Sequence, residues 1–312
     1  MVQLQSILIL FLTAFSTVVA VDPDAIYDGG LPSNSSPIAL RIGNGGAGQS
    51  GLVKALSDAF ISQSIRNGST PFRIAWYKSD TTVTINYLAA GTVDVGITYS
   101  EVAENLAISR GDAIEPRYYI FRDHFQITGP KSNPAGLEED MTMVELFAKM
   151  YQEAERGTVV KQFGPGGEVE EVGVRWLSRY DKSATNIKES EFWIGIGQVP
   201  WATAYSTWYH QYIGFPNAAL KSAILLNEYT LTDRGTYLSL PAELQNQTVI
   251  YKAGGDEDPE DPLLNPAFLL VGAKAKDEEM ARMFAEWCVG QGGQDVVRGF
   301  KKSGEVLYSP AP

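Results

Sequence analysis

A short segment in the second half of the sequence carries side chains suited to holding an anion. Arg179 supplies a guanidinium group, and Ser183 and Thr185 supply hydroxyl groups. The segment follows a predicted strand over 171–177 and precedes a predicted helix, so these groups would meet at a helix N-terminus, where negative charge is favoured. Without further context, helix capping and a surface arginine explain the same residues more simply.

A glycine-rich loop near the start of the chain is the second candidate. Residues 43–48 read Gly-Asn-Gly-Gly-Ala-Gly and match the dinucleotide pattern G-x-G-x-x-G. The acidic residue that should end the next strand is missing, so we do not predict a dinucleotide. Backbone amides that lead into a helix still suit an anion, although a tight turn that needs glycine explains the spacing equally well. Asn44, Gly45, Gly46 and Ser50 are therefore candidate ligand contacts, and Ser50 is also the predicted N-cap of the following helix.

Composition excludes several classes of partner. The chain of 312 residues has 25 basic and 37 acidic residues and a net charge of −12, which argues against nucleic acid. A single cysteine, Cys288, excludes an internal disulfide and a cysteine-rich zinc site. No motif calls for a cofactor. The acidic run over 256–261 lacks the spacing of a calcium loop, so we interpret it as a solvated loop.

Nucleophilic catalysis finds little support in the sequence. A G-x-S-x-G elbow is absent, and the two histidines, His124 and His210, each lie in an aromatic stretch that favours packing over proton transfer. The helix predicted to begin at Asp277 places Cys288 on its apolar face with Phe284, which predicts a buried and unreactive thiol.

The N-terminus has the features of an export signal. An apolar run over 7–19 ends in small residues, which predicts a signal peptide over 1–20 and a flexible leader over 21–36. A membrane anchor is the alternative, but the run is shorter than a spanning helix requires. We therefore expect a secreted, extracellular protein with no membrane insertion after cleavage. Three N-x-[ST] sequons predict glycans on Asn34, Asn67 and Asn246.

Strands alternate with helices along the chain, which predicts a layered α/β fold. The order begins with a strand over 38–42 and an amphipathic helix, followed by strands over 72–77 and 93–98. The remaining expected elements are a helix over 101–109, a strand over 118–128, a helix over 141–156, an exposed loop over 157–167, a helical stretch over 191–212 and a strand over 266–271.

Several segments together resemble the bacterial tungstate-binding proteins of ABC uptake systems. The run Tyr-Thr-Leu-Thr-Asp-Arg-Gly-Thr-Tyr over 229–237 is close to a signature of that family, and Ser-Arg-x-Asp-x-Ser-x-Thr over 178–185 is similar to its anion motif. Residues 117–136 look like the family's entry into the second lobe, 264–266 like its return segment, and 50–52 like the start of its first helix. The resemblance extends over residues 38–305.

The resemblance implies a type 2 periplasmic-binding-protein fold, in which two α/β lobes are joined by two crossing strands with a ligand cleft between them. One lobe would comprise 37–127 plus 267–312, and the other 128–266. The crossings would lie near 125–129 and 266–271. A monomer that closes over a small anionic ligand is the implied behaviour.

Departures from the family bear on the ligand rather than on the fold. The family's first anion loop is rich in hydroxyl groups, whereas the glycine loop here keeps only backbone amides. Its G-T-G loop corresponds to 80–82, where Asp80 would repel an oxyanion if it pointed inward. Thr81, Arg179, Ser183 and Thr185 remain as candidate contacts.

Three hypotheses follow. The leading one is a secreted, non-enzymatic solute-binding protein that holds a small anion, tungstate-like or related, between its lobes. The chain has no lipid-attachment cysteine after the signal and resembles the secreted fungal relatives of the family, so the second hypothesis is an extracellular interaction protein that reuses the scaffold to engage a host or cell-wall partner. An enzyme evolved in the cleft is the third. Thermal-shift screening against oxyanions separates the first two.

Overall fold

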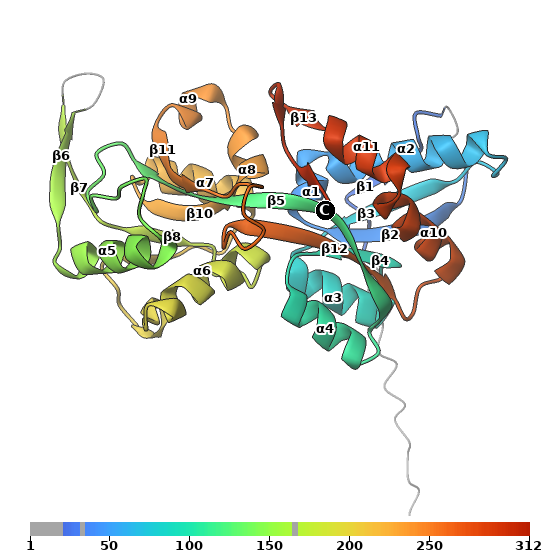
Figure 1. Ribbon diagram of the computed structural model, residues 1–312, viewed down its shortest axis with the longest axis horizontal. Coiled ribbons are helices and arrows are strands. Elements are labelled where there is room, and N and C mark those ends of the chain that lie inside the picture. The colour runs from blue at the N-terminus through green and yellow to red at the C-terminus, as the bar shows by residue number, and fades with distance from the viewer. Residues whose placement is uncertain (1–20, 32–34, 164–167) are drawn as a thin grey trace, which may run out of the picture.

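The computed structural model describes residues 21–31, 35–163 and 168–312, so the predicted signal peptide and Asn34 lie outside the described residues. The chain forms two α/β lobes that lie side by side, and two long strands run from one to the other (Figure 1). These strands are β5 (Ala113–Pro130) and β12 (Leu264–Gly272). The α/β class and the pair of crossing strands agree with the prediction.

The first lobe is built on a sheet with the strand order β1-β3-β2-β4-β12-β5. Its parallel centre consists of β2 (Ile38–Asn44), β3 (Arg73–Lys78) and β4 (Val95–Thr98), with β1 (Ala25–Tyr27) antiparallel at the edge. Helices cover both faces, and for that reason β2 and β4 are buried almost throughout. The helices on one face are α2 (Leu52–Arg66), α10 (Glu278–Val289) and α11 (Gln291–Gly299), and those on the other are α3 (Thr81–Ala90) and α4 (Glu101–Ser109).

The second lobe continues the sheet with β10, β8 and β9. β10 (Tyr229–Asp233) is antiparallel to β5, and β8 (Trp176–Ser178) and β9 (Tyr209–Gln211) follow it in parallel. β11 (Thr248–Ala253) pairs with β5 as well. The helices of this lobe are α5 (Met143–Glu155), α6 (Ala184–Gly195), α7 (Pro216–Leu225), α8 (Arg234–Leu238) and α9 (Ala242–Gln245).

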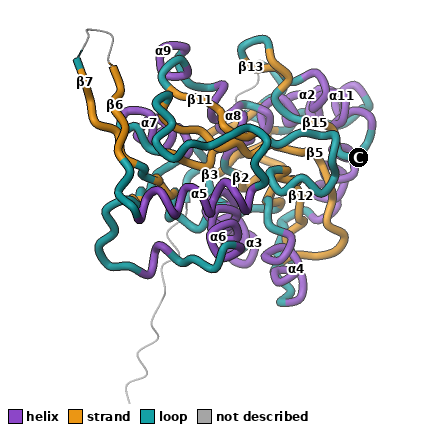
Figure 2. The backbone as a smooth tube through the Cα atoms, turned by 60° about the vertical axis from the view of Figure 1, so that its left-hand side comes forward, coloured by secondary structure: helices purple, strands orange, loops and turns teal. Residues whose placement is uncertain are grey.

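The change from one lobe to the other takes place within β5. As far as His124 this strand pairs with β12, and from Phe125 onward it pairs with β10. The two crossing strands therefore form the floor beneath the space between the lobes. In Figure 2, the helices α3 of the first lobe and α6 of the second lie next to each other on one side of these strands.

The core of the second lobe is dominated by aromatic side chains. Trp193 on α6 is fully buried, and its ring centroid lies 4.7 Å from that of Phe147, 5.5 Å from Trp208 and 5.6 Å from Trp176. Edge-to-face rings at these distances bury large apolar areas and fix side-chain orientation. This cluster anchors α6, whose N-terminus borders the space between the lobes.

The predicted helical stretch over 191–212 is wrong. α6 ends at Gly195, and a short 3-10 turn (Pro200–Ala202) and then β9 follow. Gly197 has a φ of +73°, a left-handed conformation that terminates helices, and Pro200 cannot continue one. The aromatic residues of this stretch come from α6, the 3-10 turn, β9 and the loops between them, so they do not form one helix face.

Other local predictions also need correction. Ser50 is not the N-cap of α2: it is the last residue of the short helix α1 (Gly46–Ser50), and Gly51 occupies the cap with a φ of +101°. The predicted loop over 157–167 contributes a strand to an antiparallel hairpin of β6 (Val159–Phe163) and β7 (Val169–Gly173), around residues 164–167 that lie outside the described part. Cys288 is 1% exposed and burial raises the pKa of its thiol, which confirms its predicted burial.

Candidate functional site

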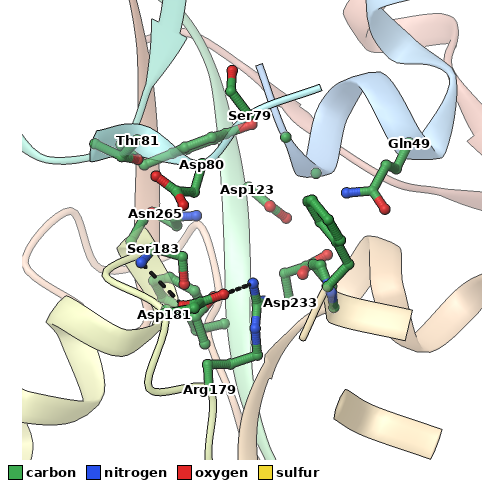
Figure 3. Close-up of a pocket in the computed structure, with 18 of the residues that line it drawn as sticks. Gln49, Ser79, Asp80, Thr81, Asp123, Arg179, Asp181, Ser183, Asp233 and Asn265 are labelled. Atoms are coloured by element: carbon green, nitrogen blue, oxygen red, sulfur yellow. Dashed lines mark hydrogen bonds and ion pairs between the residues drawn. The ribbon is translucent and has the colours of Figure 1, made fainter. Parts of the chain in front are cut away.

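A cavity of about 380 Å³ lies between the lobes, above the crossing strands. Both lobes and both crossing strands supply its walls, and Figure 3 shows its polar side chains pointing toward one another from several elements. The lining residues with polar or charged side chains are Gln49, Ser79, Asp80, Thr81, Tyr99, Asp123, Arg179, Asp181, Ser183, Thr185, Asp233 and Asn265.

Arg179 is the centre of the wall formed by the second lobe. It follows directly after β8, and only 5% of the residue is exposed. Its Nε donates to the carbonyl oxygen of Gly214 at 2.9 Å, and its guanidinium forms an ion pair with Asp181. Asp181 also accepts a hydrogen bond from the backbone N–H of Ser183 at 3.1 Å. The guanidinium is therefore held in one orientation beside the cavity (Figure 3).

The first turn of α6 forms the rest of this wall. Ser183 is its N-cap, and its hydroxyl oxygen accepts a hydrogen bond from the backbone N–H of Asn186 at 3.4 Å. Thr185, which is 7% exposed, follows in the first turn. α7 also begins at the cavity, at Pro216. Helix N-termini carry partial positive charge, so these two favour an anionic group here.

The wall formed by the first lobe carries a carboxylate in place of a cation. Asp80 caps α3, and its Oδ1 accepts the backbone N–H of Val83 at 2.8 Å. Burial raises the pKa of Asp80 above its usual range in spite of this bond. Thr81 is 4% exposed, and within the described part of the chain its Oγ1 has no hydrogen-bond partner.

Polar side chains from the crossing strands and from β10 line the base of the cavity. Asp123 lies on β5, Asn265 on β12 and Asp233 at the end of β10. Burial, together with the neighbouring Asp233 carboxylate, raises the pKa of Asp123 well above its usual range. Both oxygens of Asp233 accept hydrogen bonds from Thr236, at 2.7 Å from its backbone N–H and 2.6 Å from its hydroxyl.

The sequence analysis missed these base residues and Gln49. Asp233 and Asn265 each lie inside a segment that carried the family resemblance, which is the signal that could have singled them out. Gln49 on α1 points into the cavity in Figure 3, and no described residue accepts a hydrogen bond from its buried Nε2. An amide donor without a partner is available to a ligand.

The structure places most of the predicted contacts together. Gly45, Gly46 and Thr81 line the first-lobe side of the cavity, opposite Arg179, Ser183 and Thr185. Asn44 and Ser50 are not brought into this set. The Asn44 amide donates to the carbonyl oxygen of Ile97 at 3.0 Å and accepts from the N–H of Gly48 at 2.7 Å. The Ser50 hydroxyl lies 2.7 Å from that of Tyr308.

The glycine loop has a packing explanation. A Cβ atom on Gly48 would lie 2.2 Å from the Trp76 ring, and one on Gly45 would lie 2.8 Å from the carbonyl oxygen of Ser79. Both positions therefore need glycine for the close approach of neighbouring elements. Gly46 borders open space, because a Cβ atom there would meet no atom of the described structure within 4 Å.

The histidines lie away from the cavity lining. The Nε2 atom of His124 is 3.1 Å from Asp256, and the Nδ1 atom of His210 is 2.8 Å from the buried Glu228. Across residues 21–31, 35–163 and 168–312, no group of three or more His, Cys, Asp or Glu side chains is arranged to hold a metal ion.

Comparisons with known proteins agree with this architecture. A family model described as the PBP superfamily domain matches residues 31–291. The tungstate-binding protein TupA of Peptoclostridium acidaminophilum is 26% identical over 226 residues, which cover 70% of this chain and 69% of that protein. The predicted resemblance to tungstate-binding proteins is confirmed.

Two solved structures carry the same fold. One, described as "a periplasmic putative metal binding protein", is 60% identical, has a TM-score of 0.82, and is matched over 93% of this chain and 99% of its own. The tungstate-binding protein TupA of Desulfovibrio alaskensis G20 has a TM-score of 0.66 at 21% identity, over 88% of this chain and 99% of its own. The predicted type 2 periplasmic-binding-protein fold is confirmed. Within the described residues, no helix is long and apolar enough to span a membrane.

Proposed function

The chain belongs to the PBP superfamily, and from this premise we propose that it is a secreted solute-binding protein that holds a small ligand, through an anionic group, in the cavity between its lobes. The observation that carries the proposal is the placement of Arg179. Its guanidinium is buried, fixed by Asp181 and Gly214, and lies beside the capped N-terminus of α6. A fixed guanidinium can present two parallel N–H donors to an oxyanion or a carboxylate.

The relatives support binding rather than catalysis. The three proteins named above are described as binding proteins, two of them as tungstate-binding and the third as metal-binding. We propose that the anionic group lies against Arg179, Ser183 and Thr185, with Gly46 and Thr81 opposite. The division into lobes of 37–127 plus 267–312 and of 128–266 remains part of this proposal.

Ligand binding to the purified protein tests the proposal. Thermal-shift and calorimetric titrations with tungstate, molybdate, phosphate and small organic anions should find at least one stabilising ligand, because a ligand that binds only the folded state raises its stability. Arg179→Ala should weaken that ligand's affinity by roughly 10- to 100-fold, since a charged hydrogen bond contributes ~1.5–3 kcal/mol. Arg298→Ala is the matched control, because this exposed arginine pairs with Asp295 on α11, away from the cavity. Equal affinity in both variants would refute the proposed site.

Secretion is the second part of the proposal. It is supported by the apolar run over 7–19 and by two sequons whose asparagines, Asn67 and Asn246, are exposed. Mass spectrometry of the protein secreted from its native host or a eukaryotic host should find an N-terminus near Val21 and a mass that falls on deglycosylation. Retention of Met1 with an unchanged mass would contradict export.

A further inference from the structure

The walls of the cavity carry more negative than positive charge. Four aspartates line it, Asp80, Asp123, Asp181 and Asp233, whereas Arg179 is the one basic side chain among the lining residues of the described chain. The Arg179 charge is already matched by Asp181. An inorganic oxyanion in this cavity would meet a neutralised arginine and further carboxylates, which is an unfavourable field for a compact double negative charge.

Asp80 is the lining carboxylate of the first-lobe wall, and like Asp123 and Asp233 at the base of the cavity it forms no ion pair with a described residue. Asp181 is paired with Arg179, and Asp233 accepts two hydrogen bonds from Thr236. Burial raises the pKa of Asp80 and so does the Asp181 charge, and together they outweigh the lowering by the backbone N–H groups of Val83 and Thr82 and by Arg179. A cationic group placed beside Asp80 would therefore relieve an existing electrostatic cost.

The cavity is too large and too apolar for a tetrahedral oxyanion alone. Its volume of about 380 Å³ falls in the ~300–1,000 Å³ range of sites that take organic ligands. The exposed apolar surface among the lining residues comes from Ile213, which is 78% exposed, and Phe215, which is 45% exposed. An inorganic ion would leave this surface in contact with water.

The volume does not come from lobes that have swung apart. The Thr82 hydroxyl on α3 donates to the carbonyl oxygen of Lys182 beside α6, at 3.0 Å. The Nζ atom of Lys78 in the first lobe lies 4.3 Å from the centroid of the Phe215 ring in the second. The lobes therefore already touch at the rim, and the space between them is the space that a ligand has to fill.

A second observation on the wall beside Asp80 also favours a polar ligand. The Thr81 hydroxyl is buried and unpartnered in the described structure, and a buried polar group without a partner costs free energy until something bonds to it. Gln49, whose Nε2 atom also lacks a described partner, points into the cavity from the same lobe (Figure 3). Polar groups on a ligand would give both side chains a hydrogen-bond partner.

We infer that the ligand is a small organic zwitterion of amino-acid type. Its carboxylate lies against Arg179 and the first turn of α6, its ammonium group lies against Asp80, and its carbon skeleton lies against Ile213 and Phe215. The inference rests on the proposed function, because it keeps the anionic group at Arg179, and it adds a cationic group and an apolar part to the ligand.

Matched ligands test this inference. We would titrate the purified protein with the L-amino acids and with tungstate and phosphate. For the tightest amino acid, we would then titrate the carboxylic acid that lacks its amino group and the amine that lacks its carboxylate. At least one amino acid should bind, and each half-ligand should bind at least 10-fold more weakly.

Asp80→Asn is the informative variant, because asparagine also caps helices well and the fold should be kept. It should weaken amino-acid binding roughly 10- to 100-fold and leave the deaminated acid unchanged or bound more tightly. Asp277→Asn is the control, since Asp277 makes the same cap on α10 with the N–H of Met280 at 2.9 Å, away from the cavity.

The possible failures are distinguishable. If tungstate or phosphate binds in an Arg179-dependent manner and no amino acid does, the proposed function stands and the zwitterion is refuted. If the deaminated acid binds as tightly as the amino acid, or if Asp80→Asn leaves amino-acid affinity unchanged, the ammonium site is refuted. If no probe binds, both the function and the inference fail.

Discussion

The two walls of the cavity differ in how many of their polar and charged groups already have a partner within the protein. On the second-lobe wall the cation already has its partner, since Arg179 bonds to Asp181 and Gly214, and Ser183 caps α6. On the first-lobe wall Asp80 is half-buried and forms no ion pair with a described residue, and Thr81 has no described partner for its hydroxyl. One wall is thus preorganised to recognise an anionic group, whereas the other is completed by the ligand itself. A preorganised wall lowers the entropic cost of binding. A wall with unpartnered groups favours ligands that supply the missing partners over ligands that do not.

The largest effect should come from the core that supports the second-lobe wall. Trp193→Ala removes a fully buried indole that contacts Phe147, Trp176 and Trp208, and should lower the free energy of unfolding by about 3–5 kcal/mol. Denaturant unfolding followed by circular dichroism measures this. A loss below about 1 kcal/mol would show that α6 is not anchored by this cluster.

The stability of the ligand-free Arg179→Ala variant provides the next test, because Arg179 belongs to the second-lobe wall. An arginine kept for a ligand is expected to line a hydrated cleft, and Arg179→Ala would then hardly change the stability of the ligand-free protein. The structure contradicts that premise, since Arg179 is 5% exposed and paired with Asp181. Removing it leaves Asp181 without its cation, so we now expect a loss of about 1–3 kcal/mol.

Ligand-free thermal and urea unfolding of Arg179→Ala checks this revised expectation. The double variant Arg179→Ala with Asp181→Asn should recover part of the loss, because the unpaired carboxylate is then gone. An unchanged melting temperature in Arg179→Ala would restore the hydrated-cleft interpretation and weaken the contrast between the two walls.

A buried acid on α6 should give the second lobe a pH dependence. Burial raises the pKa of Glu189 to about 7, and its Oε1 accepts the Tyr209 hydroxyl at 2.8 Å. The pKa in the folded state therefore exceeds the ordinary value of 4.5, so the folded protein binds more protons between pH 4.5 and 7. Stability from this group is complete below pH 4.5 and falls as pH rises toward 7, by at most about 1.4 kcal/mol per pH unit.

Glu189→Gln isolates that contribution. Urea unfolding at several pH values between 4.5 and 7 should show a shallower decline in the variant than in the parent protein. Glu279→Gln, an exposed acid on α10, should leave the decline unchanged. Parallel curves for parent and Glu189→Gln would mean that Glu189 is not the group responsible.

The difference between the walls also explains what the sequence could predict. Strand and helix alternation predicts the α/β class, and the motif over 178–185 leads to Arg179, Ser183 and Thr185 because a single local segment holds all three. Asp123, Asp233 and Asn265 meet only because β5, β10 and β12 converge beneath the cavity. Such convergence of distant segments is a property of the sheet topology, and local patterns do not reveal it.

Errors within elements have equally physical origins. The aromatic residues between 191 and 212 resemble one helix in the sequence, but α6 ends before a left-handed Gly197 and Pro200, and the residues beyond belong to a 3-10 turn, loops and β9. The glycine loop has the spacing of a phosphate-binding loop, but Gly45 and Gly48 are required by the close approach of Ser79 and Trp76. The surrounding structure excludes one helix over 191–212, whereas Gly45 and Gly46 line the cavity, so the glycine loop is compatible with both packing and ligand contact.

The smallest predicted effect concerns the unpartnered Thr81 hydroxyl on the first-lobe wall. Thr81→Val keeps the shape of the side chain and removes a hydroxyl that has no described partner, so the stability of the ligand-free protein should stay the same or rise slightly. If the ligand forms a hydrogen bond with this hydroxyl, the affinity of the variant for the ligand should fall by about 0.5–1.5 kcal/mol, or roughly 2- to 12-fold. Thr236→Val is the contrasting control, because that hydroxyl already donates to Asp233 at 2.6 Å and its loss should reduce stability without a ligand. If Thr81→Val loses stability and keeps its full affinity for the ligand, then the Thr81 hydroxyl already has a partner in the ligand-free protein. The contrast between the two walls would then be wrong.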